Sequence, residues 1–145
     1  MIELRESLEI EIPKFIEMEN SDEASEFIIP HTFEKHRSEL RKKNIHYLSI
    51  YKDNALKGFF ILSIGMNDDV EFRRVVVASK GDGIGQASIK LMEAYCKENI
   101  GARRIWLDVF SFNKRGQHIY KKLGYVQFGV DEYEGKELLL YEKQL

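Results

Sequence analysis

The chain has 145 residues, 43% of them apolar, and a formal net charge of −2 from 22 basic and 24 acidic side chains. This is the size and composition of one folded domain over residues 1–145, which excludes a disordered chain. No apolar run approaches the length of about 18 residues that a membrane-spanning helix needs. The charged N-terminus lacks the apolar region of a signal peptide. One Cys and four scattered His argue against a disulfide or a structural zinc site. We therefore expect a cytoplasmic protein without a membrane span or a metal.

The first 45 residues predict one strand and then helices. Residues 2–5 form a short candidate strand. A helix is expected after Ser7, which is a candidate N-cap followed by apolar residues at helical spacing. Ser21 precedes a second short apolar group, which Pro30 ends, and Thr32 is a candidate N-cap for another helix that runs to about Lys43.

The middle of the chain predicts three consecutive strands. Residues 46–51, 55–64 and 70–78 are rich in β-branched and aromatic side chains, and turn signals at 52–54 and 67–69 separate them. The third of these strands contains three consecutive valines, a pattern that is typical of a strand buried on both faces.

The last third alternates helices and strands. The predicted elements are a helix at 85–99 capped by Gly101, a strand at 105–110, a helix at 113–123 closed by Gly124, and a hairpin of 125–130 with 137–141. The inner stripe of the first helix is expected to be Ile84, Ala87, Ser88, Leu91, Met92, Tyr95 and Cys96. The order β-α-α-β-β-β-α-β-α-β-β indicates an α/β (α+β) sandwich of about six to seven strands in a mixed, mostly antiparallel sheet.

A glycine-rich loop between the third strand and its helix is the segment most informative about chemistry. Gly81, Gly83 and Gly85 let backbone N–H groups approach a ligand, and the helix that follows has free N–H donors and a partial positive charge at its N-terminus. Together they form a candidate seat for a phosphate or pyrophosphate. A P-loop is excluded because Gln86-Ala87 stands where Lys-Ser/Thr is required, and the dinucleotide fingerprint lacks its third glycine.

The same loop resembles a motif of the GNAT superfamily of N-acetyltransferases. Lys80-x-x-Gly83-x-Gly85 is similar to that family's acetyl-CoA loop, Arg/Gln-x-x-Gly-x-Gly/Ala. Downstream, Asn113, Tyr120 and Gly124-Tyr125 match its second signature, Asn-x-x-Ala-x-x-x-Tyr-x-x-x-Gly-Phe. Gly116 stands where that signature usually has Ala. The resemblance covers residues 46–128 best, and it implies a GNAT-like fold and direct transfer of an acetyl group from acetyl-CoA to an amine, without a covalent enzyme intermediate.

The resemblance also implies catalytic and cofactor-binding residues. Tyr120 is the expected acid for the departing thiolate, because a phenol is protonated at neutral pH. Glu71 is the expected base for the acceptor ammonium, with Asp69 as the alternative and His46 and His118 as weaker ones. The residues expected to bind acetyl-CoA are Val75, Val77, Lys80, Gly81, Asp82, Gly83, Ile84, Gly85, Gln86, Asn113 and Tyr120. A backbone N–H near Val75 is the expected oxyanion donor.

The remaining candidates have equally good structural explanations. Asn113 can bind cofactor or cap its helix. Arg115, Lys121 and Lys122 can reach the 3′-phosphate of the cofactor or form a solvated basic face. Trp106 and Cys96 are expected in the core, which makes Cys96 a poor nucleophile.

The charge distribution bears on partners. Residues 1–70 carry a net −5 and residues 71–145 a net +3, too little for a nucleic-acid-binding face. Residues 1–34 carry 10 acidic and 2 basic side chains, which favours a cationic acceptor by steering. The acceptor is expected to be an amine of a small molecule or peptide, selected by the N-terminal helices and the loops at 20–32 and 131–136. A catalytically silent acetyl-CoA sensor and a nucleotide-binding protein are the rival functions, and a monomer and a homodimer are both compatible with the sequence.

Overall fold

A computed structural model describes residues 1–78 and 83–145, except for the side chain of Glu23. Its seven-stranded sheet has the order β1-β2-β3-β4-β5-β7-β6, and only the β4–β5 pair is parallel. The strands are β1 (Ile2–Glu6), β2 (Ile45–Lys52), β3 (Ala55–Ile64), β4 (Asp69–Val77), β5 (Arg104–Phe110), β6 (Val126–Tyr133) and β7 (Lys136–Gln144). The predicted mixed, mostly antiparallel sheet is confirmed.

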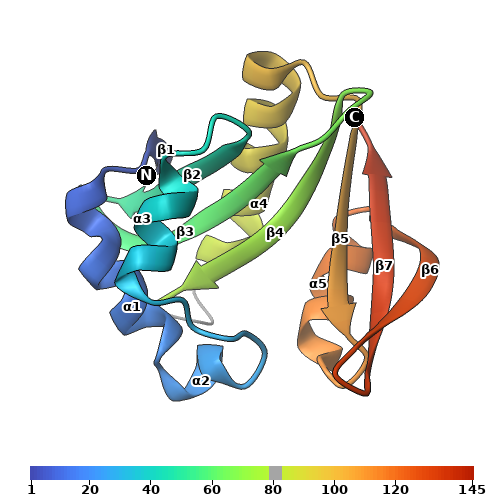
Figure 1. The fold of residues 1–145 in the computed structure, drawn as a ribbon. Helices are drawn as coiled ribbons and strands as arrows, with labels where there is room; N and C mark the ends of the chain where they lie inside the picture. Colours follow the sequence, from blue (N-terminus) through green and yellow to red (C-terminus); the bar gives the residue numbers. More distant parts are fainter. Residues whose placement is uncertain (79–82) are drawn as a thin grey trace.

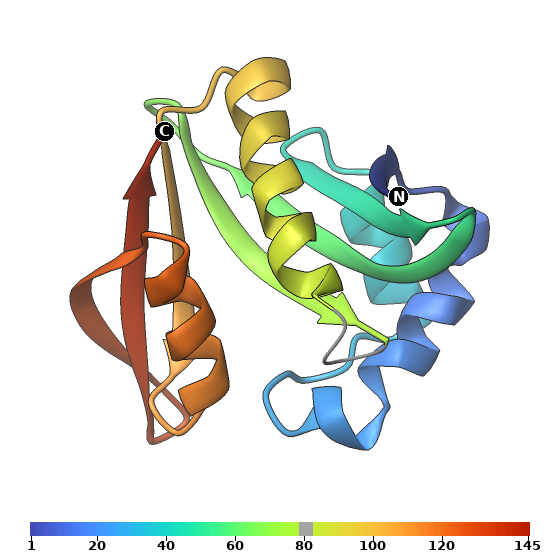
Figure 2. The same ribbon diagram turned by 180° about the vertical axis from the view of Figure 1, so that it is seen from behind.

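Helices cover the two faces of this sheet unequally. The helices are α1 (Ile12–Glu19), α2 (Asp22–Ser25), α3 (Phe33–Leu40), α4 (Ile84–Tyr95) and α5 (Lys114–Lys122), with a 3₁₀ turn η1 (Glu9–Glu11) and a π-helical turn η2 (Cys96–Ile100). Helices α1, α2 and α3 lie on one side of β2–β4 (Figure 1), and α4 and α5 lie on the other (Figure 2). The β5–β7–β6 part is covered by α5 on one face only.

The predicted caps and turns explain where most elements begin and end. The side chains of Ser21 and Thr32 accept backbone N–H groups at the starts of α2 and α3. The hairpin between β2 and β3 turns at Asp53-Asn54, both at positive φ, which is the backbone that a two-residue hairpin requires. Ser7, in contrast, does not cap a helix, because its hydroxyl bonds to Ser49 in β2 and η1 begins after Leu8.

Two apolar clusters form the core, one on each face of β2–β4. The cluster on the α1 and α3 side contains Val76, and the cluster under α4 and α5 has Val75 and Val77 packed against it, so the predicted burial of both faces of β4 is confirmed. Cys96 is buried as expected. Two expectations are wrong: Leu91 is exposed while Ile89 is buried in α4, and Trp106 is only half-buried.

Candidate active site

The strands β4 and β5 diverge to form a cleft. They pair only from Asp69 with Arg104 to Glu71 with Trp106, and beyond these residues they separate (Figures 1 and 2). A β-bulge at Arg73, which has no partner between the pairs Phe72–Leu62 and Arg74–Ile61, bends β4 at this point. The cleft has a volume of about 700 Å³ and is lined from both faces of the sheet.

One end of the cleft is the N-terminus of α4. Gly83, the N-cap, has φ +79, and it lines the cleft together with Gly85 and Gln86. A Cβ added to either glycine would meet no atom of the described residues within 4 Å, so these residues leave the space above this backbone open to a ligand. The first turn of α4 carries no acidic residue, and its N–H groups and dipole favour an anion. This end therefore fits a pyrophosphate, although the candidates Lys80, Gly81 and Asp82 lie outside the described residues.

The strand β4 supplies the wall next to this end. Val75 and Val77 both line the cleft, and because β4 pairs with β5 only as far as Glu71, its backbone beyond this residue has polar groups facing the cleft instead of a strand. Such groups can bind the amides of a pantetheine arm. Ile84, also predicted to bind cofactor, is buried in the core.

Tyr120 extends into the cleft from α5. Its ring packs edge-on against Phe72 of β4, at 5.9 Å between centroids, and against Tyr125 at 6.0 Å. Burial and, to a smaller extent, the nearby Asp108 carboxylate raise the pKa of Tyr120 to about 12. The phenol is therefore protonated at neutral pH and able to donate a proton.

The carboxylate that lines the cleft is Asp108 of β5, which the sequence reasoning missed. Asp108 is exposed to the open cleft, and desolvation by the surrounding protein, followed by the negative charges of Glu71 and Asp131, raises its pKa. Glu71, the predicted base, lies beside it and accepts hydrogen bonds from Arg73, at 3.0 Å from Nη2. The alternative, Asp69, is paired with Arg104 at 3.1 Å. In the sequence, the feature that could have identified Asp108 is that it is the one acidic residue in the otherwise apolar strand 105–110.

The two histidine candidates do not line the cleft, and of the three candidate cations one does. His46 is on β2, where its Nδ1 lies 2.8 Å from the hydroxyl of Tyr95, and His118 is exposed on α5; neither lines the cleft. Arg115 does line it, whereas Lys121 and Lys122 are in the last turn of α5 and do not.

The second motif is held by a local hydrogen-bond network. The Asn113 side chain accepts the N–H of Gly116 at 2.9 Å and so caps α5, while the residue also lines the cleft. A Cβ at Gly116 would lie 2.8 Å from Asn113 Nδ2, which explains a glycine at this position. The buried Gln117, not singled out from the sequence, donates to three carbonyl groups at the β5–α5 turn, those of Phe110, Ser111 and Asn113.

The cleft side formed by the α2–α3 connection and the β6–β7 hairpin is mostly apolar. Phe27, Ile28 and Ile29 line it from one side and Tyr133 from the other, as expected for the loops predicted to select the acceptor. His31 joins this wall, and burial, followed by the charge of Arg74, lowers its pKa to about 4.

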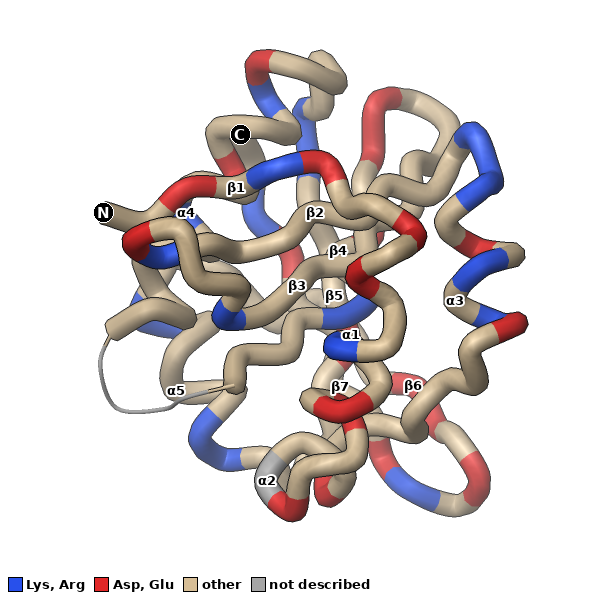
Figure 3. Tube along the Cα trace, turned by 90° about the vertical axis from the view of Figure 1, so that its left-hand side faces the viewer, with Lys and Arg blue, Asp and Glu red and all other residues tan. Residues whose placement is uncertain are grey.

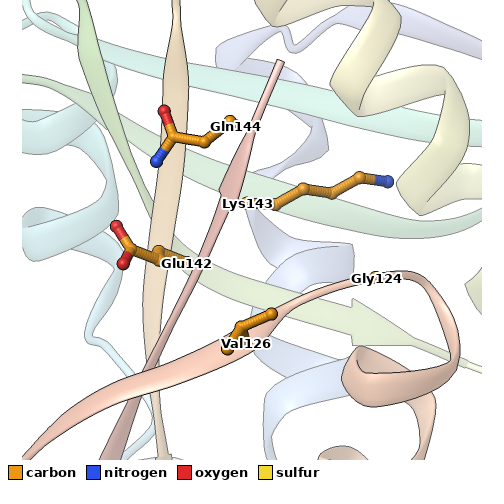
Figure 4. Close-up of a pocket in the computed structure, with 5 residues that line it drawn as sticks. All are labelled: Gly124, Val126, Glu142, Lys143 and Gln144. Atoms are coloured by element: carbon orange, nitrogen blue, oxygen red, sulfur yellow. The ribbon is translucent and has the colours of Figure 1, made fainter.

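A second hollow lies between the start of β6 and the end of β7. It has a volume of about 370 Å³ and is lined by Gly124, Val126, Glu142, Lys143 and Gln144. Lys143 and Glu142 point to opposite sides of β7 (Figure 4). Lys143 donates to Glu93 and to the Leu123 carbonyl, and Glu142 accepts from Arg104. Both charges are thus paired within the protein, and we assign no chemistry to this hollow.

Metal-binding clusters and membrane-spanning helices are both absent from residues 1–78 and 83–145. These residues include no group of His, Cys, Asp and Glu side chains arranged to hold a metal ion. Within the same ranges, no helix is both long and apolar enough to cross a membrane.

Comparisons with known proteins place the chain in a family. Residues 7–125 match the model of the acetyltransferase (GNAT) family. A Bacillus subtilis (strain 168) protein described as "Putative [ribosomal protein bS18]-alanine N-acetyltransferase" is 33% identical over 111 residues, covering 74% of this chain and 72% of that protein. The streptothricin acetyltransferase of Streptomyces lavendulae is 27% identical over 94 residues, which are 61% of this chain and 49% of that protein.

Solved structures agree in fold. The Vibrio cholerae spermidine N-acetyltransferase in complex with CoA and spermine superimposes with a TM-score of 0.87 at 17% identity, covering 99% of this chain and 95% of that chain. The Escherichia coli ribosomal-protein-S18-alanine N-acetyltransferase gives 0.82 at 13% identity, covering 99% and 94%.

Proposed function

Since the chain belongs to the acetyltransferase (GNAT) family and is an acetyl-CoA-dependent N-acetyltransferase, we propose that Asp108 and Tyr120 perform its two proton transfers in the cleft between β4 and β5. One observation carries this proposal. A carboxylate with a raised pKa and a protonated phenol line the same cleft, and the Asp108 carboxylate is close enough to Tyr120 to raise the pKa of its phenol.

Acetyl-CoA supplies the acetyl thioester, and the protein supplies position and proton transfer. The N-terminus of α4, with Gly83 and Gly85, binds the pyrophosphate of acetyl-CoA, and the backbone of β4 beside Val75 binds its pantetheine arm. Asp108 accepts a proton from the acceptor ammonium, so that the amine nitrogen can form its bond to the acetyl carbon. Tyr120 donates its proton to the sulfur as the carbon–sulfur bond breaks, and the second proton that the nitrogen loses on forming the amide restores the Tyr120 phenol. Glu71 raises the basicity of Asp108 through its negative charge.

The acceptor is a primary amine of a small molecule or a peptide. The names of the relatives include a ribosomal-protein alanine, streptothricin and spermidine. The acidic N-terminal segment gives little support for a cationic acceptor, because at least five of its acids are in ion pairs: Glu3, Glu9, Glu17, Glu19 and Glu34. Along α3, basic and acidic residues alternate (Figure 3), so this face is mixed in charge. The preferred acceptor is identified by measuring CoA release with four amines: a peptide with N-terminal alanine, streptothricin, spermidine and 2-phenylethylamine.

The pH dependence of kcat/KM separates the two candidate bases. Asp108→Asn should lower kcat/KM at neutral pH by about 10²–10⁴-fold, and the loss should shrink at high pH, where the amine is already deprotonated. Glu71→Gln should cost less than about tenfold. It should also move the acid limb of the profile to lower pH, because removing a like charge lowers the pKa of Asp108. If Glu71→Gln shows the large loss and Asp108→Asn the small one, Glu71 is the base.

A further inference from the structure

The wall of the cleft formed by residues 27–31, which we call the acceptor wall, is held by few backbone contacts. It lies between the end of α2 at Ser25 and the start of α3 at Phe33, so no strand ladder or helix holds it beyond the first turn after α2. Phe27, Ile28, Ile29 and His31 nevertheless line the cleft. A segment without regular structure needs other contacts to keep a defined surface.

Two of these contacts reach the wall from distant parts of the sequence. Arg74 of β4 donates through Nη2 to the carbonyl of Ile29 at 2.9 Å, and the N–H of His31 donates to Oε1 of Glu19 at 3.3 Å. Arg74 also donates through Nη1 to Oε2 of Glu19. The same guanidinium therefore joins the wall, the end of α1 and the strand just after the bulge.

Glu19 is a buried carboxylate with both oxygens occupied. Its side chain is fully buried, and Oε1 lies 2.6 Å from Nε2 of His36. Because Nε2 faces a carboxylate it is the donor, and Nδ1 lies 2.7 Å from the hydroxyl of Tyr47 in β2, so both ring nitrogens have a partner. Burial alone would raise the pKa of Glu19, but the hydrogen bond from His36 and the charge of Arg74 lower it. Such a charge is retained in a core only when it is fully paired.

We propose that this buried network of Glu19, His36 and Arg74 is a positioning device, which fixes the acceptor wall over the reacting end of the cleft and so sets the affinity for the acceptor amine. The inference rests on the proposed function, in which this side of the cleft receives the acceptor. Arg74 lies one residue beyond the bulge that opens the cleft, so the wall is fixed relative to the strand that binds the acetyl group. None of the three residues needs to touch the reacting atoms.

Arg74→Lys is the discriminating variant. Lysine keeps a positive charge for Glu19, but it lacks the planar fork that bridges Glu19 and the Ile29 carbonyl at once. Arg41→Lys is the matched control, because Arg41 also pairs with a carboxylate of the same layer, Glu9 at 3.2 Å, but is exposed and does not line the cleft. Both variants should melt close to the wild-type temperature.

Hydrogen exchange followed by mass spectrometry tests the positioning itself. Peptides covering residues 26–32 should exchange at least tenfold faster in Arg74→Lys and unchanged in Arg41→Lys. Steady-state kinetics then use whichever of the four panel amines has the highest kcat/KM. For Arg74→Lys, the KM of that amine should rise at least tenfold while the KM of acetyl-CoA stays within twofold.

Two outcomes overturn the proposal. Unchanged exchange at 26–32 in Arg74→Lys means that Arg74 does not hold the wall. Faster exchange with an unchanged KM for the amine means that the wall does not bind the acceptor. Neither result depends on which residue is the base, so the proton-transfer roles of Asp108 and Tyr120 stand or fall separately, in the pH profiles.

Discussion

Replacing Gly85 should change the stability of the free protein and its affinity for acetyl-CoA in opposite directions. Gly85 is the second residue of α4 and has no positive φ, and a Cβ added to it would have no atom of residues 1–78 or 83–145 within 4 Å. Alanine here reduces the freedom of the unfolded chain and favours the helix. The same Cβ would occupy the space in which the backbone is expected to meet the pyrophosphate.

The magnitudes follow from the two effects. A glycine in a helix costs about 0.5–1 kcal/mol relative to alanine, so Gly85→Ala should raise the melting temperature of the free protein by about 1–4 °C for a domain of this size. A charge-assisted hydrogen bond contributes about 1.5–3 kcal/mol. If the larger side chain of Gly85→Val prevents even one such hydrogen bond to the pyrophosphate, acetyl-CoA binding should weaken by about tenfold or more.

Calorimetry with acetyl-CoA and thermal melts with and without it measure both quantities. The melting temperature of wild type should increase with acetyl-CoA concentration as mass action requires, and that increase should be much smaller in Gly85→Val. Gly83→Val is a less direct test, because φ +79 at this position strains any β-branched residue. An unchanged dissociation constant in folded Gly85→Val would refute the placement of the pyrophosphate at the α4 N-terminus.

Three further substitutions test other parts of the site. Tyr120→Phe should lower kcat by about 10²–10⁴-fold with the acetyl-CoA dissociation constant within twofold; a kcat within threefold of wild type would leave Tyr120 a packing residue. The pKa of His31 is about 4 in the folded protein against about 6.5 unfolded, so the unfolded state takes up a proton first as pH falls, and stability is lost between these two values. His31→Gln should therefore reduce the difference in urea midpoint between pH 7.5 and pH 5, and an undiminished difference would assign the acid sensitivity to other groups. Gln117→Leu should cost about 1–3 kcal/mol, since the Ser111 carbonyl loses the Gln117 donor, while the carbonyls of Phe110 and Asn113 each keep a backbone N–H; a thermal melt indistinguishable from wild type would contradict this.

Local patterns predicted most of the elements and the candidate cofactor end of the site. The hairpin turn at Asp53-Asn54, the caps at Thr32 and Asn113, and the glycines around the start of α4 are properties of a few consecutive residues, because capping and turn geometry depend on neighbours in sequence. Tyr120 was predicted from the resemblance to the family's second signature, which spans a few consecutive turns from Asn113. These features could be predicted without knowing how the strands pair.

Long-range pairing decided the rest. Asp108 becomes a cleft residue only because β4 and β5 stop pairing after Glu71 and Trp106, a divergence that no local periodicity encodes. Glu19 and Arg74 are 55 positions apart, so their ion pair depends on the packing of α1 against β4. The same packing buries Glu19, which therefore contributes no charge to the surface. The sequence by itself therefore indicated which chemical groups are candidates to bind the cofactor, and the tertiary structure decided which carboxylates face the cleft and which are neutralised in the core, because burial and ion pairing depend on contacts between residues far apart in the chain.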